Sequence, residues 1–205
     1  MEPAEDFVAR LYDRLDPVEL ADLTPRFGDG DLNDAPSPTG RALKPAAVIA
    51  PVLMHDGPPR ILLTERASHL AKHAGQIAFP GGRIEPDDAG PADAALREME
   101  EEVGIAPVHV EIIGRFDLYE TVTGYCVTPF VGLVRPGYTL RPDPSEVADV
   151  FETPVDFLMN PDNHERHSRV WQGRERHFYA MPWKQRYIWG ATAGMIKSLY
   201  DRLYG

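Results

Sequence analysis

The stretch from Pro91 to Gly104 constrains the fold of this chain more than any other part of the sequence. Pro91 suits the first turn of a helix, where its missing N–H is not needed, and Asp93 suits the positive end of the helix dipole. Gly104 fits the left-handed residue that ends a helix, and Pro107 prevents its continuation. These signals predict a helix over residues 91–103.

Apolar runs typical of strands lie on both sides of this helix. Strands are expected at residues 46–54, 60–67, 76–79, 109–120, 125–134, 176–183 and 186–190. Further helices are expected at residues 5–15, 155–159 and 191–203. Strands before and after a central helix, with helices at both ends, predict an α/β or α+β layered domain.

Three glutamates of the central helix share one face. Glu98, Glu101 and Glu102 are spaced i, i+3 and i+4, so their carboxylates repel one another. Arg97 can relieve Glu101, but one guanidinium cannot neutralise three carboxylates. A divalent cation can, and hard oxygen ligands without cysteine or histidine favour Mg²⁺ or Mn²⁺ over Zn²⁺. The alternative is a solvated acidic face, but the glycine turn Pro80-Gly81-Gly82 and an acidic loop before the helix favour metal-bound phosphate chemistry.

The net charge of the chain excludes some classes of function. The 205 residues carry a net charge of -11, and residues 85–102 alone hold eight acidic side chains and one basic one. General nucleic-acid binding needs a basic face and is therefore not expected. The single cysteine, Cys126, excludes an intramolecular disulfide and a cysteine-based zinc cluster.

The apolar run at 46–54 is too short to span a bilayer, so no membrane association is expected and a cytoplasmic enzyme is predicted. The length suits one main domain, at residues 46–205, with residues 1–45 as an appended helix and loop.

The central segment resembles the Nudix box, a motif with a glycine, a glutamate and then Arg-Glu-U-x-Glu-Glu-x-Gly-U, where U is aliphatic. Gly82 matches the first glycine, and residues 97–105 match the whole second half. Asp88 replaces the first glutamate, and the loop that follows it is one residue longer than in the general pattern. The resemblance implies a Nudix fold, which is an α/β/α sandwich with a mixed central β-sheet.

The segment before the helix, LLTERASHLAKHAGQIAFPGG at residues 62–82, resembles the signature of the coenzyme A pyrophosphatase branch of the Nudix hydrolases. Ala71 stands where that branch usually has arginine. The resemblance implies hydrolysis of the diphosphate linkage of coenzyme A or its derivatives, giving 3′,5′-ADP and 4′-phosphopantetheine or its acyl form. The candidates for binding substrate are the basic residues and turn glycines of this segment, Arg66, His73, Gly81 and Gly82.

The expected mechanism assigns a role to each acidic residue. Glu98, Glu101 and Glu102 are the candidate metal ligands, and Glu98, Glu101 and Glu146 are the candidate catalytic residues. Either Glu98 or Glu146 can serve as the general base that takes a proton from water. Arg97 is expected to orient the neighbouring carboxylates without touching substrate.

Two other functions stay open on the sequence. One is a Nudix hydrolase for another nucleoside diphosphate, such as ADP-ribose, dinucleotides or capped RNA. The other is a nucleotide-sensing module that has kept the fold and lost catalysis, although the intact glutamates argue against it. A monomer and a homodimer are both compatible with the sequence.

Overall fold

The computed structural model describes residues 3–19, 24–33, 42–55, 57–70, 73–171 and 173–205. Two sheets and four α-helices make up this part of the chain. The strands of the large sheet are β1 (Phe27–Gly28), β2 (Lys44–Leu53), β3 (Arg60–Arg66), β4 (Ile77–Ala78), β5 (Gly81–Arg83), β6 (Val110–Arg115), β7 (Tyr119–Glu120), β8 (Tyr125–Val134) and β9 (Val147–Pro154). The small sheet holds β10 (Glu165–Trp171), β11 (Arg174–Trp183) and β12 (Arg186–Trp189). The helices are α1 (Ala4–Arg14), α2 (Pro91–Val103), α3 (Val155–Leu158) and α4 (Ala191–Tyr204), with 3₁₀ turns at Pro107–His109 and Pro161–Asn163.

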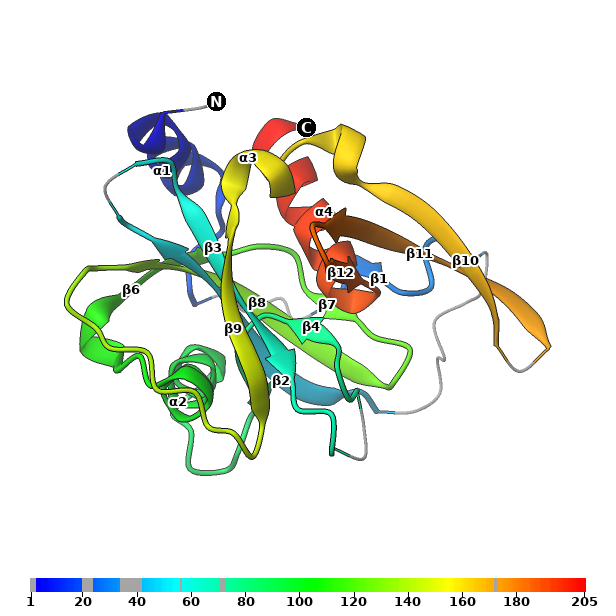
Figure 1. Cartoon of the computed structure of the whole chain (residues 1–205), viewed down its shortest axis with the longest axis horizontal. Helices are drawn as coiled ribbons and strands as arrows, with labels where there is room; N and C mark the ends of the chain where they lie inside the picture. The colour runs from blue at the N-terminus through cyan, green and yellow to red at the C-terminus, as the bar shows by residue number, and fades with distance from the viewer. Residues whose placement is uncertain (1–2, 20–23, 34–41, 56, 71–72, 172) are drawn as a thin grey trace.

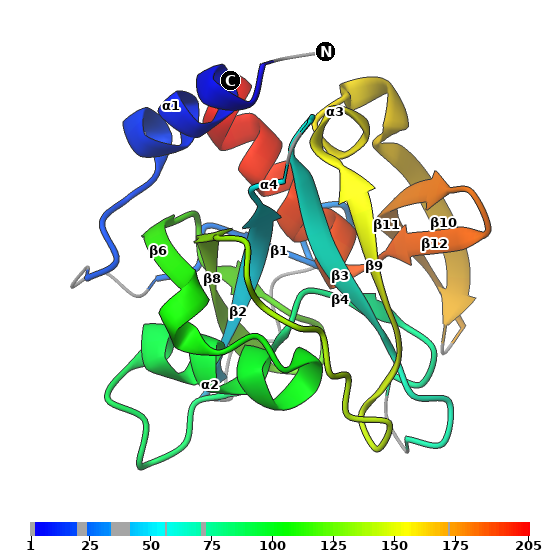
Figure 2. The same ribbon diagram turned by 60° about the vertical axis from the view of Figure 1, so that its left-hand side comes forward.

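The large sheet is mixed, and its spine is the order β1-β7-β8-β2-β3-β4. Strands β2 and β8 run parallel along their whole length, from Lys44↔Tyr125 to Leu53↔Val134. Strand β5 pairs antiparallel with β2, and β9 pairs antiparallel with β3. Helix α2 covers one face of the sheet, and α4 with α1 lies on the other (Figures 1 and 2). This arrangement confirms the expected α/β/α sandwich with a mixed central sheet.

Strand β2 explains how the sheet separates two cores. Its sequence KPAAVIAPVL is apolar on both faces, as expected for a strand with layers on both sides. Ala47 and Ile49 pack in the core under α2, whereas Ala46 and Ala50 pack in the core shared with α1 and α4. Because burying one large aliphatic side chain contributes about 1.5–3 kcal/mol, each core holds its helix layer firmly in place.

Helix α1 belongs to the same packed body as the rest of the chain. Its apolar residues Phe7 and Leu11 are fully buried in the core that also contains α4. The division of the chain at residue 45 stays a prediction. Among the residues that the structure describes, no helix has the length and apolarity needed to cross a bilayer.

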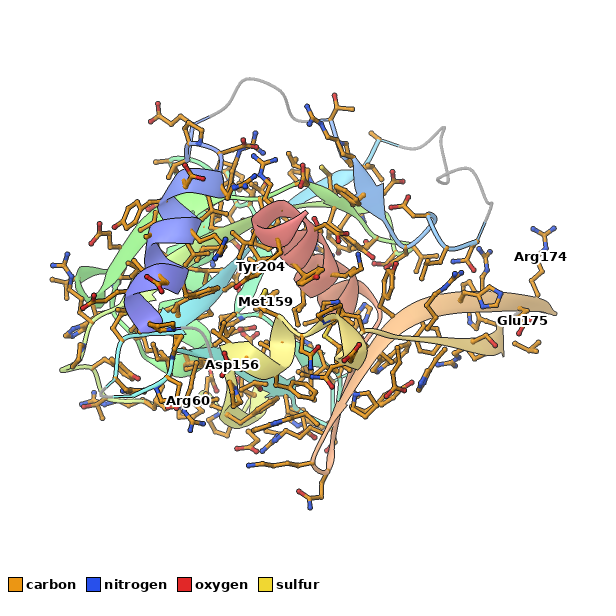
Figure 3. The ribbon with its side chains drawn as sticks, turned by 90° about the horizontal axis from the view of Figure 1, so that it is seen from above. Arg60, Asp156, Met159, Arg174, Glu175 and Tyr204 are labelled. Carbon is orange, nitrogen blue, oxygen red and sulfur yellow. The ribbon has the colours of Figure 1, made fainter. Side chains whose placement is uncertain are left out.

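Most elements expected from the sequence are confirmed, including the helix over residues 91–103 with the same bounds. One segment differs from the expectation: the sequence predicts no strand between residues 134 and 155, but Val147–Pro154 forms strand β9, which pairs with β3 inside the sheet. Strand β10 was not expected either, since its side chains are almost all exposed and lack an apolar face. Together β10 and β11 form a hairpin that extends from the body, with Arg174 and Glu175 at its far end (Figure 3).

Candidate active site

Helix α2 presents its acidic residues at one end of the sheet. Ala94, Ala95, Met99 and Val103 are fully buried against β2, which fixes the rotation of the helix about its axis. Gly104 ends the helix in the left-handed conformation, with φ 77°, and its N–H bonds to the carbonyl of Glu100. The helix therefore offers Glu98 and Glu102 toward the glycine turn, while Glu100 is exposed.

The two glycines of the turn let the backbone approach its neighbours closely. A side chain on Gly81 would lie 2.4 Å from the carbonyl oxygen of Ala47, and its φ of 150° also favours glycine. A side chain on Gly82 would lie 2.4 Å from the carboxylate carbon of Glu98. The groups that approach the two glycines are therefore strand β2 at Gly81 and the carboxylate of Glu98 at Gly82.

Glu102 is the most buried of the glutamates, with only 2% of its surface exposed. Burial raises the pKa of its carboxyl to about 8; the guanidinium of Arg66 opposes this shift, and the nearby charges of Glu98 and Glu146 add to it. The carboxylate accepts a hydrogen bond of 3.3 Å from the N–H of Gly81 and lies 3.5 Å from Nη1 of Arg66. One ion pair at that distance leaves a buried negative charge only partly compensated.

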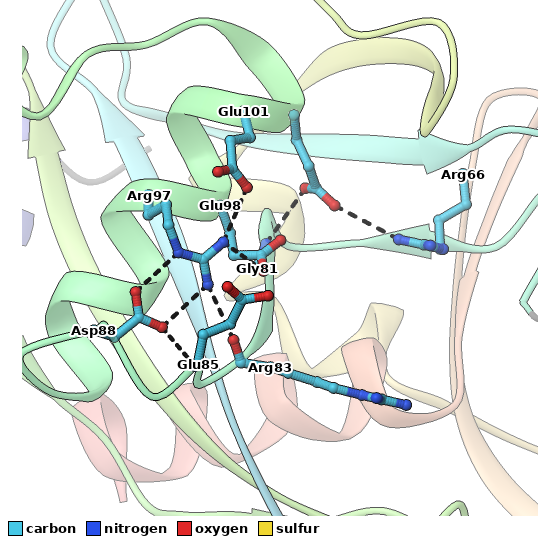
Figure 4. A network of polar contacts seen from close by, with 9 residues as sticks. Arg66, Gly81, Arg83, Glu85, Asp88, Arg97, Glu98 and Glu101 are labelled. Carbon is cyan, nitrogen blue, oxygen red and sulfur yellow. Dashed lines mark hydrogen bonds and ion pairs between the residues drawn. The ribbon is translucent and has the colours of Figure 1, made fainter.

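Arg97 is the centre of a polar network drawn in Figure 4. Its guanidinium donates to Asp88 through Nε at 2.8 Å and Nη2 at 3.1 Å, and to Glu98 and Glu101 through Nη1 at 3.0 and 2.9 Å. Nη2 also donates to the carbonyl of Arg83 at 3.1 Å. The orienting role expected for Arg97 is thus compatible with its contacts, and the group that holds Arg97 itself is Asp88.

Asp88 was not among the site residues expected from the sequence. Its hydrogen bonds from Arg97 lower the pKa of its carboxyl, and a backbone hydrogen bond from Glu85 acts in the same direction. The signal that could have found it is its position, because it stands where the Nudix box has its first glutamate. The extra residue in the loop does not prevent this aspartate from reaching the arginine.

We expect Asp88→Asn to lower kcat about tenfold with little change in KM, because Arg97 without the charge of Asp88 would pair more tightly with Glu98 and Glu101 and hold them away from a metal. Asp87→Asn is the matched control, since Asp87 is an exposed neighbour with the same side chain. Steady-state kinetics on both variants measure the effect. Equal kinetics for the two variants would show that Asp88 does not position the site.

Glu146 reaches the site through the loop before β9. Its carbonyl accepts a hydrogen bond of 2.8 Å from the N–H of Ala67, next to Arg66, and the N–H of Asp143 bonds to the carbonyl of Glu102. Its negative charge raises the pKa of both Glu98 and Glu102, after burial as the main cause. The structure therefore brings Glu146 near the two inner glutamates of α2.

Two residues stand apart from this group. Glu101 is 55% exposed at its side chain and turns toward Arg97. His73 is exposed with φ 58°, and its Nδ1 lies 2.7 Å from Oε1 of Gln76, which is a contact within the same loop. Ala71, which replaces the arginine usual in the coenzyme A branch, lies outside the described residues.

The negative charge of the glutamates suits a divalent cation, but their side chains are not oriented to bind one together. Within the described ranges, no group of three or more histidine, cysteine, aspartate or glutamate side chains is arranged to hold a metal ion. The reason is that Arg97 turns Glu98 and Glu101 toward itself, whereas Glu102 faces Gly81 and Arg66. The raised pKa of the buried Glu102, with two like charges near it, shows a site that lacks positive charge and suits a cation.

A mixed sheet that carries a carboxylate helix and a glycine turn suits a hydrolase that acts on phosphate anhydrides. A family model described as the NUDIX domain matches residues 43–174. NudL, a Nudix hydrolase of Escherichia coli K12, is 42% identical over 154 residues, which cover 75% of this chain and 80% of NudL. A NudL of Shigella boydii serotype 18 matches to the same extent. The chain therefore belongs to the Nudix hydrolase family and is a pyrophosphohydrolase, and enzymes of this family generally use divalent metal ions.

Solved structures of Nudix proteins also match. The Nudix domain of Shewanella oneidensis NrtR, crystallised with ADP ribose, has a TM-score of 0.49 and 19% identity, covering 83% of this chain and 94% of its own. The Caenorhabditis elegans Ap4A hydrolase binary complex has a TM-score of 0.47 and 17% identity, covering 54% of this chain and 80% of its own.

Proposed function

We propose that this hydrolase cleaves the diphosphate linkage of coenzyme A or its derivatives with Mg²⁺ or Mn²⁺, giving 3′,5′-ADP and 4′-phosphopantetheine or its acyl form. The observation that carries the proposal is the ion pair between Arg66 and Glu102. It joins the segment that resembles the coenzyme A branch to the glutamates of the Nudix box. The substrate would be a small nucleotide, and the net charge of -11 argues against general nucleic-acid binding.

We assign the metal to Glu98, Glu101 and Glu102. When bound, a divalent cation screens the phosphate charge, lowers the pKa of a bound water and stabilises the leaving phosphate. Glu98 and Glu102 are the inner ligands in this proposal because they face the glycine turn, and Glu101 would have to turn away from Arg97.

The general base is Glu98 or Glu146 in this proposal. The carboxyl of Glu98 has a raised pKa, mainly through burial, and this makes it a stronger base than an ordinary glutamate. Glu146 is the alternative base, and it comes from a separate element, the loop before β9. In this proposal Arg66, which faces the glutamates, supplies positive charge to the substrate phosphates. Gly81 and Gly82 would bind substrate through their backbone, which lies close against β2 and Glu98. His73 would bind substrate only from the loop after β3.

Mass spectrometry of the products tests this function. Coenzyme A incubated with the enzyme and Mn²⁺ is expected to yield 3′,5′-ADP and 4′-phosphopantetheine, because attack at the diphosphate separates those two parts. A panel with ADP-ribose, dinucleotides and capped RNA serves as the comparison. Rapid cleavage of ADP-ribose beside intact coenzyme A would reject the proposed substrate, and tight nucleotide binding without metal-dependent turnover would point to a sensing module.

A further inference from the structure

We propose that Arg83, held by Tyr125, binds the 3′-phosphate of coenzyme A; the identity of this phosphate rests on the proposed function. Arg83 is the last residue of β5 and follows Gly82 directly. Its Nε and Nη2 both donate to Oη of Tyr125, at 3.1 and 2.8 Å. The guanidinium also lies 5.7 Å from the centre of the Tyr125 ring. The phenol thus fixes the direction of a long side chain that would otherwise move freely.

The positive charge of Arg83 is not neutralised by any residue that the structure describes. Across the part of the chain that the structure describes, no carboxylate lies within ion-pair distance of its guanidinium, and its partner Tyr125 is neutral. Lys44 pairs with Tyr125 in the register of β2 and β8 and adds a second positive charge. A planar guanidinium with free N–H groups suits a phosphate monoester.

The strand geometry separates this site from the scissile diphosphate. Gly82 pairs with Ala47 and Arg83 with Ala46, and these two alanines pack in different cores. Side chains therefore alternate, so that Gly82 faces Glu98 and Arg83 points to the opposite face of the sheet. Figure 4 shows the side chain of Arg83 extending away from the carboxylates.

Gly82, which lies beside Glu98, and Arg83 are consecutive residues of β5, so the two binding positions are close together along the strand. In coenzyme A the ribose joins the 3′-phosphate to the 5′-diphosphate through only a few bonds. A substrate that bends around the edge of β5 can place its diphosphate near Glu98 and its 3′-phosphate on Arg83. The site would then select coenzyme A over nucleotides that lack this phosphate.

Kinetics on two substrates that differ only in this group test the inference. Arg83→Ala is expected to raise KM for coenzyme A about tenfold with kcat nearly unchanged, because a charge-assisted hydrogen bond to a phosphate is lost. For dephospho-coenzyme A, which has no 3′-phosphate, KM should change less than twofold. Tyr125→Phe keeps the ring and removes the acceptor, so a smaller loss of the same selectivity is expected. Arg135→Ala is the control, since Arg135 is an exposed arginine paired with Glu111.

A binding measurement separates this inference from the proposed function. Calorimetry with 3′,5′-ADP and with 5′-AMP should show that Arg83→Ala weakens only the former. If coenzyme A is cleaved but the variant affects both substrates equally, the role of Arg83 is overturned and the proposed function stands. If coenzyme A is not cleaved, the proposed function fails, and the two nucleotides alone decide whether Arg83 binds a 3′-phosphate.

Discussion

Glu102→Gln is expected to lower kcat about a thousandfold. The variant keeps the shape of the side chain and its hydrogen bond from Gly81, but it removes the buried negative charge that we assign to the metal. Metal assistance contributes several kcal/mol to such reactions, and each 1.4 kcal/mol corresponds to about tenfold in rate. Turnover of coenzyme A with saturating Mn²⁺ measures the loss, and circular dichroism verifies that the fold is retained.

Glu100→Gln is the matched control for this prediction. It makes the same chemical change two residues earlier on the same helix, at an exposed position. We expect it to keep kcat within about twofold of the original enzyme. Comparable activity of both variants would remove Glu102 from the catalytic site and, with it, the assignment of the metal.

Helix α2 could be predicted to the residue because its signals are local. Pro91 begins it and Gly104 ends it through backbone preferences that act within one turn. The spacing of Glu98 and Glu102 then follows from helix geometry alone. Gly81 and Gly82 were also informative, because a position where the backbone approaches its neighbours too closely for a side chain requires glycine.

The residues that meet α2 from other parts of the chain were harder to predict. The segment after Glu146 forms strand β9, but its pairing with β3 joins residues more than eighty positions apart in the sequence. Nothing local shows such a pairing. The contact between Asp88 and Arg97 likewise depends on the path of a loop, and the contact between Arg83 and Tyr125 joins two strands that are distant in sequence.

The polar network places an arginine between the two groups of carboxylates. Arg97 binds Asp88 on one side and Glu98 with Glu101 on the other. Glu102 receives no hydrogen bond from it and depends on burial, Arg66 and a backbone N–H. The charge that this network leaves uncompensated is therefore concentrated at Glu102, and it should be visible in the stability of the protein.

The stability of the metal-free protein is expected to fall as pH rises from about 5 to about 9, because of Glu102. Its carboxyl has a pKa raised to about 8 in the folded chain, whereas an ordinary glutamate has a pKa of about 4.3. Between these values the folded chain binds more protons than the unfolded chain, so the free energy of unfolding decreases with pH. The stabilisation is fully present below the ordinary pKa and is lost as pH rises through about 8. Its total is about 5 kcal/mol, of which about 4 kcal/mol is lost between pH 5 and pH 9.

Glu102→Gln isolates this effect, because its side chain has nearly the same shape and does not titrate. Urea unfolding with a chelator present should show a variant that gains about 4 kcal/mol relative to the original protein between pH 5 and pH 9. Parallel pH profiles for the two proteins would contradict the raised pKa. Mn²⁺ should then stabilise the original protein at high pH and have little effect on the variant. The reason is that a cation bound to the folded state compensates the negative charge of the buried Glu102 carboxylate. The same residue would thus cost stability in the free protein and hold the metal in the active one.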